Sequence, residues 1–215
     1  MTIKEELSKS ILNYDENTLK ELCQSTIENE TLTPIELVNI IGDVMSMLGK
    51  KFEKEEIMLP ELIVAANIVK DTIDEIIDPA IKASGEKRES KGKVVIGTVE
   101  SDVHSIGKDL VASFLFSNGY EVFNLGVDVP AATFIEKAEE VQADVIGLSS
   151  LVTLSMDFQK QVIEELEKRG LRDKYKVIVG GAPTSRSWAE QIGADVHADD
   201  SLEAVIKLNK LLKNE

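Results

Sequence analysis

Three short motifs in the second half of the chain carry the side chains best suited to chemistry. The first places Asp102 two residues before His104, with Gly107 three residues further on. The imidazole of a loop histidine is a candidate metal ligand, although such a side chain is more often simply solvated. Asp102 could likewise do no more than cap a helix or a turn. The first motif therefore needs support from its neighbours in space.

The other two motifs supply hydroxyl groups and glycines. The segment Ser149-Ser150-Leu151-Val152-Thr153 ends one apolar run, and Gly180-Gly181 ends another. The hydroxyls could satisfy backbone groups at a strand end, and the glycines could form nothing more than a tight turn. A shared location for all three motifs would favour a binding site for a large ligand.

The pattern after residue 92 predicts that shared location. Short apolar runs alternate with amphipathic stretches, and five such units predict a parallel sheet covered by helices on both faces, with strand order 2-1-3-4-5. Ligands of this fold bind beyond the carboxyl ends of the strands, where all three motifs would meet. The predicted strands are 93–99, 121–125, 144–149, 176–180 and 195–197. The predicted helices are 108–117, 132–141, 156–169, 185–192 and 202–212.

The first part of the chain has apolar residues at helical spacing and no convincing strand. Thr33-Pro34-Ile35-Glu36 is a capping box with proline at the first helical position, so a long helix begins there. Helices over 3–12, 19–28, from 34 and from 59 or 60 through 77 predict a four-helix bundle. A polar linker follows at 83–92. The fold class is therefore two domains, an all-α bundle over 1–91 and an α/β domain over 92–215.

Charge and composition narrow the function. The chain of 215 residues has 24 basic and 39 acidic side chains, a formal charge of −15. That balance argues against nucleic acid and against an anionic membrane surface as partners. With a single cysteine, Cys23, no disulfide within the chain is possible, and the start has no apolar signal core. We expect a cytoplasmic location.

The spacing of the three motifs resembles the cobalamin-binding signature of methionine synthase and of corrinoid methyltransferase systems. Forty-one residues (108–148) separate Gly107 from Ser149, and 28 residues (152–179) separate Leu151 from Gly180. The resemblance implies one cobalamin or related corrinoid per chain, held base-off and His-on. In that arrangement His104 displaces the cofactor's own nucleotide base and binds the cobalt from below.

The resemblance also assigns roles to other residues. Asp102 would accept a hydrogen bond from the second ring nitrogen of His104, and Ser155 would extend that relay. Gly126 and Val127 match a loop at the corrin edge. The residues implied to contact the cofactor are Ser105, Ile106, Gly107, Gly126, Val127, Ser149, Leu151, Thr153, Gly180 and Gly181.

The helical half resembles the cap domain of the same family. In the segment from Phe52 to Leu59-Pro60, Phe52 and Leu59 match the residues that cover the methyl-bearing face of the corrin. The alternative is that both side chains simply pack in the hydrophobic core of the helical bundle. Some relatives carry glycine where Glu55 stands, so the turn between the two helices is expected to differ here.

The absence of an appended catalytic module implies a free-standing carrier subunit rather than an enzyme that acts alone. Such a carrier accepts a methyl group on Co(I) from a substrate-specific methyltransferase, with a methylamine such as monomethylamine favoured as donor. It then passes the group to a second methyltransferase that acts on a thiol, such as coenzyme M, or on a pterin, in methanogenesis or one-carbon metabolism. A reductive-activation protein is a further possible partner.

Three alternatives share parts of these patterns. A cobalamin-dependent mutase subunit would have the carrier signature without the cap, and a B12-sensing regulator would usually add a DNA-binding module. A response-regulator receiver would need a phosphate-accepting aspartate where Ser149 stands. Gly107-Lys108 lacks the glycine-rich stretch of a phosphate-binding loop. Trp188 and His197 are given structural roles only.

Overall fold

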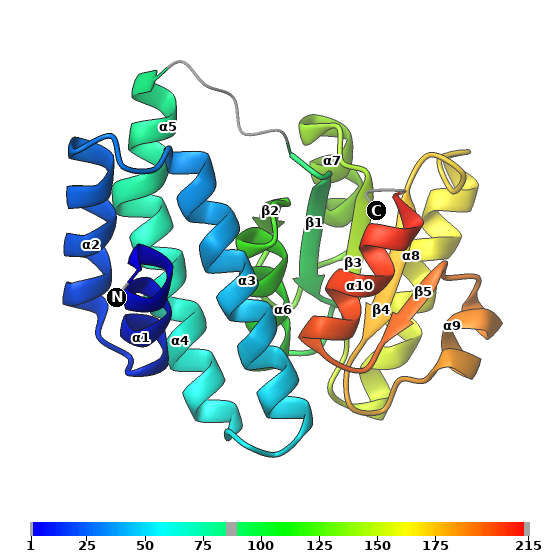
Figure 1. Ribbon diagram of the computed structural model, residues 1–215. Helices are drawn as coiled ribbons and strands as arrows, with labels where there is room; N and C mark the ends of the chain where they lie inside the picture. Colours follow the sequence, from blue (N-terminus) through cyan, green and yellow to red (C-terminus); the bar gives the residue numbers. More distant parts are fainter. Residues whose placement is uncertain (1, 85–89, 213–215) are drawn as a thin grey trace. The chain divides into compact units, whose positions relative to one another are not determined.

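The computed structural model describes residues 2–84 and 90–212, with the side chain of Glu53 excepted. The chain divides into two compact units (Figure 1). The first comprises Met1–Glu89 with Phe116–Gly119, and the second comprises Ser90–Leu115 with Tyr120–Glu215.

The first unit is a bundle of helices, in agreement with the expected fold class. Its elements are α1 (Ile3–Leu12), α2 (Glu16–Glu28), α3 (Pro34–Glu53), α4 (Leu59–Thr72), the π-helical segment η1 (Ile73–Ile77) and α5 (Asp78–Ser84). The capping box forms as predicted, because the Glu36 amide donates to Thr33 Oγ1 at 3.2 Å and the Thr33 amide donates to Glu36 Oε2 at 2.7 Å. Cys23 is fully buried in the bundle, and burial raises the pKa of its thiol to about 12.

Two predicted boundaries in this unit are wrong. Helix α2 begins at Glu16 instead of residue 19, because the Asp15 side chain caps it by accepting from the Thr18 amide at 3.1 Å. The last helix does not end at Ile77 but continues through α5 to Ser84. Ala83 and Ser84, predicted to begin the linker, are therefore helical. Residues 85–89 of the predicted linker lie outside the described residues.

The turn after α3 has the hydrogen bonds of a Schellman motif. The Glu55 amide donates to the Phe52 carbonyl at 2.9 Å, and the Glu56 amide donates to the Lys51 carbonyl at 2.9 Å. Glu55 occupies the left-handed position of this motif with φ 58°, where glycine is the usual residue. Although Glu55 is not glycine, the turn has the backbone geometry that favours glycine.

We therefore expect Glu55→Gly to raise the free energy of unfolding by about 0.5–1 kcal/mol, since glycine adopts this φ without strain. The matched control is Lys54→Gly in the same turn, at φ −86°. There glycine only adds freedom to the unfolded chain, so stability should fall by a similar amount. Urea denaturation measures both, and a loss of stability in both variants would contradict the strain.

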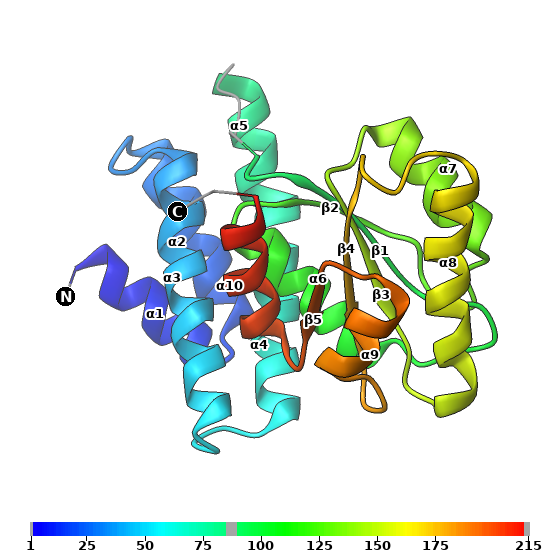
Figure 2. The same ribbon diagram turned by 90° about the vertical axis from the view of Figure 1, so that its right-hand side faces the viewer.

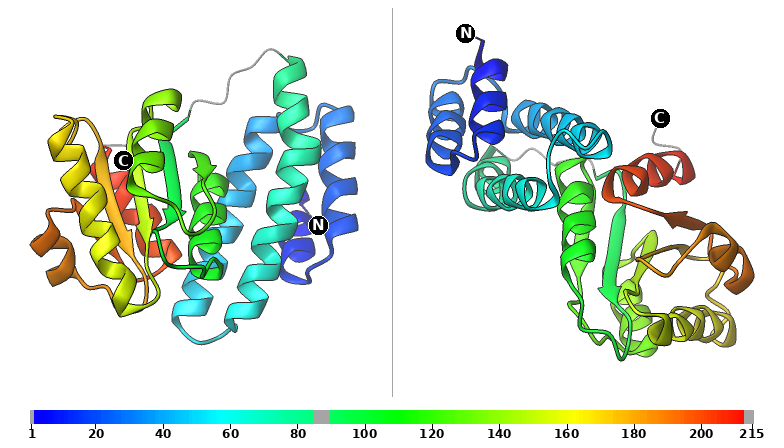
Figure 3. Two further views of the ribbon diagram at one scale, coloured as in Figure 1. Left: turned by 180° about the vertical axis from the view of Figure 1, so that it is seen from behind. Right: turned by 90° about the horizontal axis from the view of Figure 1, so that it is seen from below.

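The second unit is a doubly wound α/β layer structure. Its parallel sheet has the order β2-β1-β3-β4-β5, which confirms the predicted topology. Helices α7, α8 and α9 lie on one face and α6 and α10 on the other (Figures 2 and 3). The strands are β1 (Lys93–Thr98), β2 (Glu121–Asn124), β3 (Val145–Ser149), β4 (Lys176–Gly180) and β5 (Val196–Ala198). The helices are α6 (Ile106–Ser117), α7 (Ala131–Val141), the short 3₁₀ segment η2 (Thr153–Ser155), α8 (Met156–Lys168), α9 (Arg186–Ile192) and α10 (Ser201–Leu211).

The sheet register brings the three motifs to one edge. Thr98 at the end of β1 pairs with Ser149 at the end of β3, and Ser149 in turn pairs with Gly180 at the end of β4. A continuous apolar core below this edge joins the central strands to α7, α8 and α9. Helix α6 begins at Ile106, two residues earlier than predicted, so the loop that carries His104 is short.

None of the helices among the described residues combines the length and the apolar character that crossing a membrane requires.

Candidate functional site

The loop after β1 holds His104 in a defined position. Thr98 Oγ1 donates to the His104 carbonyl oxygen at 2.8 Å, which ties the loop back to the end of the strand. The His104 amide donates to Asp102 Oδ1 at 3.0 Å. The imidazole itself is half exposed, with 50% of the side-chain surface accessible. The backbone of this residue is therefore fixed while its ring faces outward.

The carboxylate of Asp102 is buried and serves both loops of the site. Its Oδ1 faces His104 Nδ1 at 2.7 Å, as the resemblance implied. Its Oδ2 accepts from the Leu151 amide at 2.7 Å, from the Val152 amide at 3.4 Å and from Ser155 Oγ at 2.7 Å. One carboxylate thus joins the loop after β1 to the loop after β3.

These contacts determine where the protons lie. Burial alone would raise the pKa of Asp102, but hydrogen bonds from Ser155, from the backbone amides of His104 and Leu151 and from the His104 ring together hold it well below its usual range. An ionised carboxylate only accepts, so His104 Nδ1 must donate. In the neutral ring Nε2 then keeps its lone pair, and it has no hydrogen-bond partner among the described residues. The arrangement can bind a metal ion or accept a proton at Nε2.

A second buried hydroxyl, which the sequence analysis did not single out, lies next to Ser155. Ser150 Oγ is 2.7 Å from Ser155 Oγ and 3.1 Å from the Val152 carbonyl oxygen. Because Ser155 gives its one proton to Asp102, it accepts from Ser150. The chain of hydrogen bonds therefore runs from Ser150 through Ser155 and Asp102 to His104. The position of Ser150 directly after a predicted strand was the available signal.

The glycines of the third motif lie against the backbone of the loop after β3. A Cβ added to Gly181 would lie 1.8 Å from the Ser150 carbonyl oxygen, and Gly181 has φ +124°. The Gly180 carbonyl also accepts from the Ser150 amide at 3.1 Å. Gly181 is therefore required by the close approach of the loops that follow β3 and β4.

The remaining predicted contacts fall on the same edge of this unit. Ser105 and Ser149 are half-buried, whereas Thr153 is exposed on η2. Nothing lies within 4 Å of a Cβ built on Gly107 or on Gly126. Exposed apolar side chains follow β1, β2 and β3, namely Val103, Ile106, Val127, Leu151, Val152 and Leu154. The imidazole is thus set among apolar side chains and glycines, a surface that suits a large, flat, mostly apolar ligand.

The two predicted cap residues lie in the helical unit, at the turn between α3 and α4. Phe52 is half-buried on the last turn of α3, and Leu59 begins α4 with 40% of its surface exposed. Met58 beside it is 71% exposed. Leu59 is therefore not ordinary bundle core, and the role of both residues over a corrin stays a prediction.

The two residues given structural roles have structural contacts. Trp188 Nε1 donates to Gln159 Oε1 at 2.8 Å. His197 is buried on β5, with Nε2 3.0 Å from Thr184 Oγ1. Thr184 Oγ1 already donates to the Gly181 carbonyl oxygen at 2.6 Å, so it accepts from His197 Nε2.

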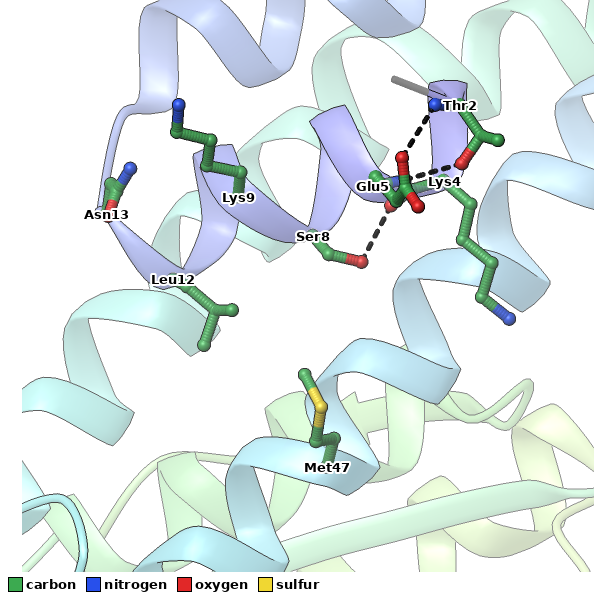
Figure 4. A pocket seen from close by; sticks show the side chains of 8 residues that line it. All are labelled: Thr2, Lys4, Glu5, Ser8, Lys9, Leu12, Asn13 and Met47. Atoms are coloured by element: carbon green, nitrogen blue, oxygen red, sulfur yellow. Dashed lines mark hydrogen bonds between the residues drawn. The ribbon is translucent and has the colours of Figure 1, made fainter.

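A surface hollow in the helical unit contains none of the predicted site residues (Figure 4). It lies against α1 and α3. Its lining residues are Thr2, Lys4, Glu5, Ser8, Lys9, Leu12, Asn13 and Met47. Ser8 Oγ there donates to the Lys4 carbonyl oxygen at 2.7 Å, and Lys4 Nζ donates to Asp43 Oδ2 on α3 at 3.1 Å. This hollow takes no part in the candidate site.

Comparison with known proteins adds independent observations. Residues 92–206 match a family model described as a B12 binding domain, and residues 3–77 match a second model with the same description. The chain is 39% identical to a corrinoid protein of Desulfitobacterium hafniense over 99% of this chain and 98% of that one. It is 41% identical to a dimethylamine corrinoid protein of Methanosarcina barkeri, over 97% and 99% of the two chains. Among solved structures it resembles a chain of the methanol:cobalamin methyltransferase complex of Methanosarcina barkeri, with TM-score 0.83, 26% identity, and coverage of 99% and 80%.

Proposed function

This chain belongs to the family of B12-binding corrinoid proteins, and from that premise we propose that it is the methyl-group carrier of a methyltransferase system. It carries one cobalamin or related corrinoid. The single observation that supports this most strongly is the His104–Asp102 pair, with its open Nε2 at the edge of the sheet. The function is that of a carrier subunit that works between two enzymes.

The residues on this edge fit a corrinoid. The Nε2 atom of His104 would hold the metal of such a planar group. Exposed apolar side chains such as Ile106 and Leu151 can contact the ring, and Gly107 and Gly126 leave the surface flat. When bound, the cofactor supplies the chemistry of accepting and releasing a methyl group.

The protein's own contribution is ligation and control of one proton. His104 would hold the cobalt through Nε2, in the base-off and His-on state, while Nδ1 keeps its proton on the bond to Asp102. Ser155 and the backbone amides of the β3 loop hold Asp102 ionised and in place. The carboxylate of Asp102 holds the ring by its Nδ1 proton, so Asp102 fixes the orientation and tautomer in which Nε2 would bind the metal.

The partners follow from the chemistry of a carrier. We propose a methyltransferase specific for a methylated amine as donor, supported by the relative named a dimethylamine corrinoid protein. Monomethylamine, favoured above, stays a prediction within that class. A solved structure similar to this chain belongs to a methanol:cobalamin methyltransferase complex, which supports direct binding to a methyltransferase. The acceptor enzyme acts on a thiol or a pterin, and a reductive-activation protein would restore the cofactor.

The lower ligand can be tested directly by reconstituting the full chain with cob(II)alamin. The electron paramagnetic resonance spectrum of the reconstituted, unlabelled protein should show splitting into triplets by one axial ¹⁴N nucleus. Labelling all histidines with ¹⁵N should convert each triplet to a doublet, because the axial nitrogen then belongs to a histidine. Triplets that survive the labelling would mean that the cofactor keeps its own base, against the proposal.

Two variants assign the signal. His104→Ala should return the triplets of the cofactor's base in the labelled protein, whereas His197→Gln, which changes the buried histidine on β5, should leave the doublets. The carrier role is tested by reducing the reconstituted protein to the Co(I) state with a chemical reductant such as titanium(III) citrate, and then mixing it with ¹³C-methylated monomethylamine or dimethylamine and an amine-specific methyltransferase. Labelled methyl groups should reach the corrinoid, and a chain that stays colourless with hydroxocobalamin would contradict the whole proposal.

A further inference from the structure

Lys108 is a charged residue buried inside the α/β unit. Only 1% of its side-chain surface is accessible, although lysine is rarely buried without partners. Its ammonium group contacts Asp109 Oδ1 and donates to Asn124 Oδ1 at 2.7 Å. Asn124 Nδ2 in turn donates to Asp109 Oδ1 at 2.8 Å. The three side chains form a closed group that neither the His104 network nor the β3 loop uses.

The charges in this group orient the Asn124 amide. The ammonium group of Lys108 donates a hydrogen bond to the amide oxygen of Asn124, and the carboxylate of Asp109 accepts one from the amide NH₂ group. Burial alone would raise the pKa of Asp109, but hydrogen bonds from Lys108 and Asn124 and the charge of Lys108 lower it, so the carboxylate stays ionised. The amide oxygen of Asn124 therefore has a fixed direction.

That direction decides the position of Gly126. The Gly126 amide donates to Asn124 Oδ1 at 3.0 Å, so one oxygen accepts from both Lys108 and the loop. Gly126 has φ +85°, and its carbonyl accepts from the Thr98 amide at 3.0 Å. A glycine held from both sides in this conformation is fixed in a loop that would otherwise be free to change.

Lys108 also follows directly on the other loop of the site. It stands in the first turn of α6, next to Gly107, and α6 begins two residues after His104. The group thus connects the segment 105–107 to the segment 126–127. Both segments carry residues that the proposed function places against the corrinoid.

We propose that Lys108, acting through Asn124, is the positioning residue that sets the distance between these two loops and so shapes the surface for the corrin ring. This inference rests on the proposed function. It assigns Lys108 no contact with the cofactor, because its ammonium group is enclosed by protein.

The test compares Lys108→Met and Asn124→Ala with the control Lys160→Met, which removes a half-exposed lysine on α8. Asn124 is exposed, so its variant keeps the test valid even if Lys108→Met folds poorly. In the protein without cofactor, the Gly126 amide should exchange with solvent at least about tenfold faster in both variants. Hydroxocobalamin, followed by quenching of Trp188 fluorescence, should bind about tenfold more weakly to both.

The double variant distinguishes positioning from general stability. If Lys108 acts through Asn124, Lys108→Met combined with Asn124→Ala should bind hydroxocobalamin no more weakly than either single variant. Additive losses of affinity in the double variant would overturn the inference, and so would an unchanged exchange rate of the Gly126 amide or an unchanged affinity for hydroxocobalamin in the single variants. If the wild type still binds hydroxocobalamin, those outcomes leave the proposed function standing. A wild-type chain that binds no hydroxocobalamin would overturn the proposed function and this inference with it.

Discussion

Replacing Gly181 with alanine is expected to lower the free energy of unfolding of the α/β unit by about 4 kcal/mol or more. The new methyl group would lie 1.8 Å from the Ser150 carbonyl oxygen, and that oxygen belongs to backbone that cannot rotate away. The backbone at φ +124° adds strain of its own, since side chains rarely adopt this conformation. Urea denaturation followed by Trp188 fluorescence measures the loss within this unit.

Gly193→Ala is the matched control for that experiment. Gly193 ends α9 with φ +81°, and nothing lies within 4 Å of a Cβ built there. The control therefore shows the effect of the backbone conformation without the collision, and about 1 kcal/mol is expected. Equal losses in the two variants would mean that the β3 and β4 loops separate easily, against the packing described.

Replacing Asp102 with asparagine should have the second large effect. Every group around this carboxylate is a donor, so an amide of either orientation places its NH₂ group against other hydrogens. With 2% of the residue exposed, water cannot repair the loss, and we expect the free energy of unfolding to fall by about 3 kcal/mol. The neutral amide also holds the Nδ1 proton of His104 less firmly than the carboxylate does, so hydroxocobalamin should bind at least about tenfold more weakly.

The pH dependence of this effect has a definite sign. Folding lowers the pKa of Asp102 below its unfolded value of about 3.9, so the carboxylate stabilises the native state above that pH. The stabilisation is lost as the pH falls through the lower, folded value. The difference in unfolding free energy between wild type and Asp102→Asn should therefore be constant near neutrality and shrink below about pH 4. A difference that grows in acid would contradict the assignment.

Most of the fold could be predicted because local patterns and packing agree. The capping box at Thr33 and the five apolar runs act within a few residues, and parallel βα units leave few topologies. The end of the last bundle helix could not be predicted in this way. Pro79 normally signals a helix end, but the π-helical segment at Ile73–Ile77 precedes it and the helix continues to Ser84.

The sequence predicted the part of the candidate site whose residues lie within one loop. The resemblance of the motif with Asp102 and His104 to the cobalamin-binding signature implied their hydrogen bond, which the structure contains. Ser150 was missed because its role depends on the position of Ser155, five residues away across a turn. Lys108 was missed because lysine is read as a surface residue, and its burial depends on Asn124 at the end of another strand.

The two histidines of the chain carry their protons on opposite ring nitrogens, and this makes them unequal toward electrophiles. A reagent that acylates an unprotonated imidazole nitrogen can reach the half-exposed side chain of His104, whose Nε2 is unprotonated, whereas His197 is buried and its Nε2 is protonated. Acylation should therefore mark one imidazole per chain, and a ligand seated on that nitrogen should protect it. Mass spectrometry would give the fraction of chains that escape acylation. That fraction equals the occupancy of the site and needs no absorption spectrum of the ligand.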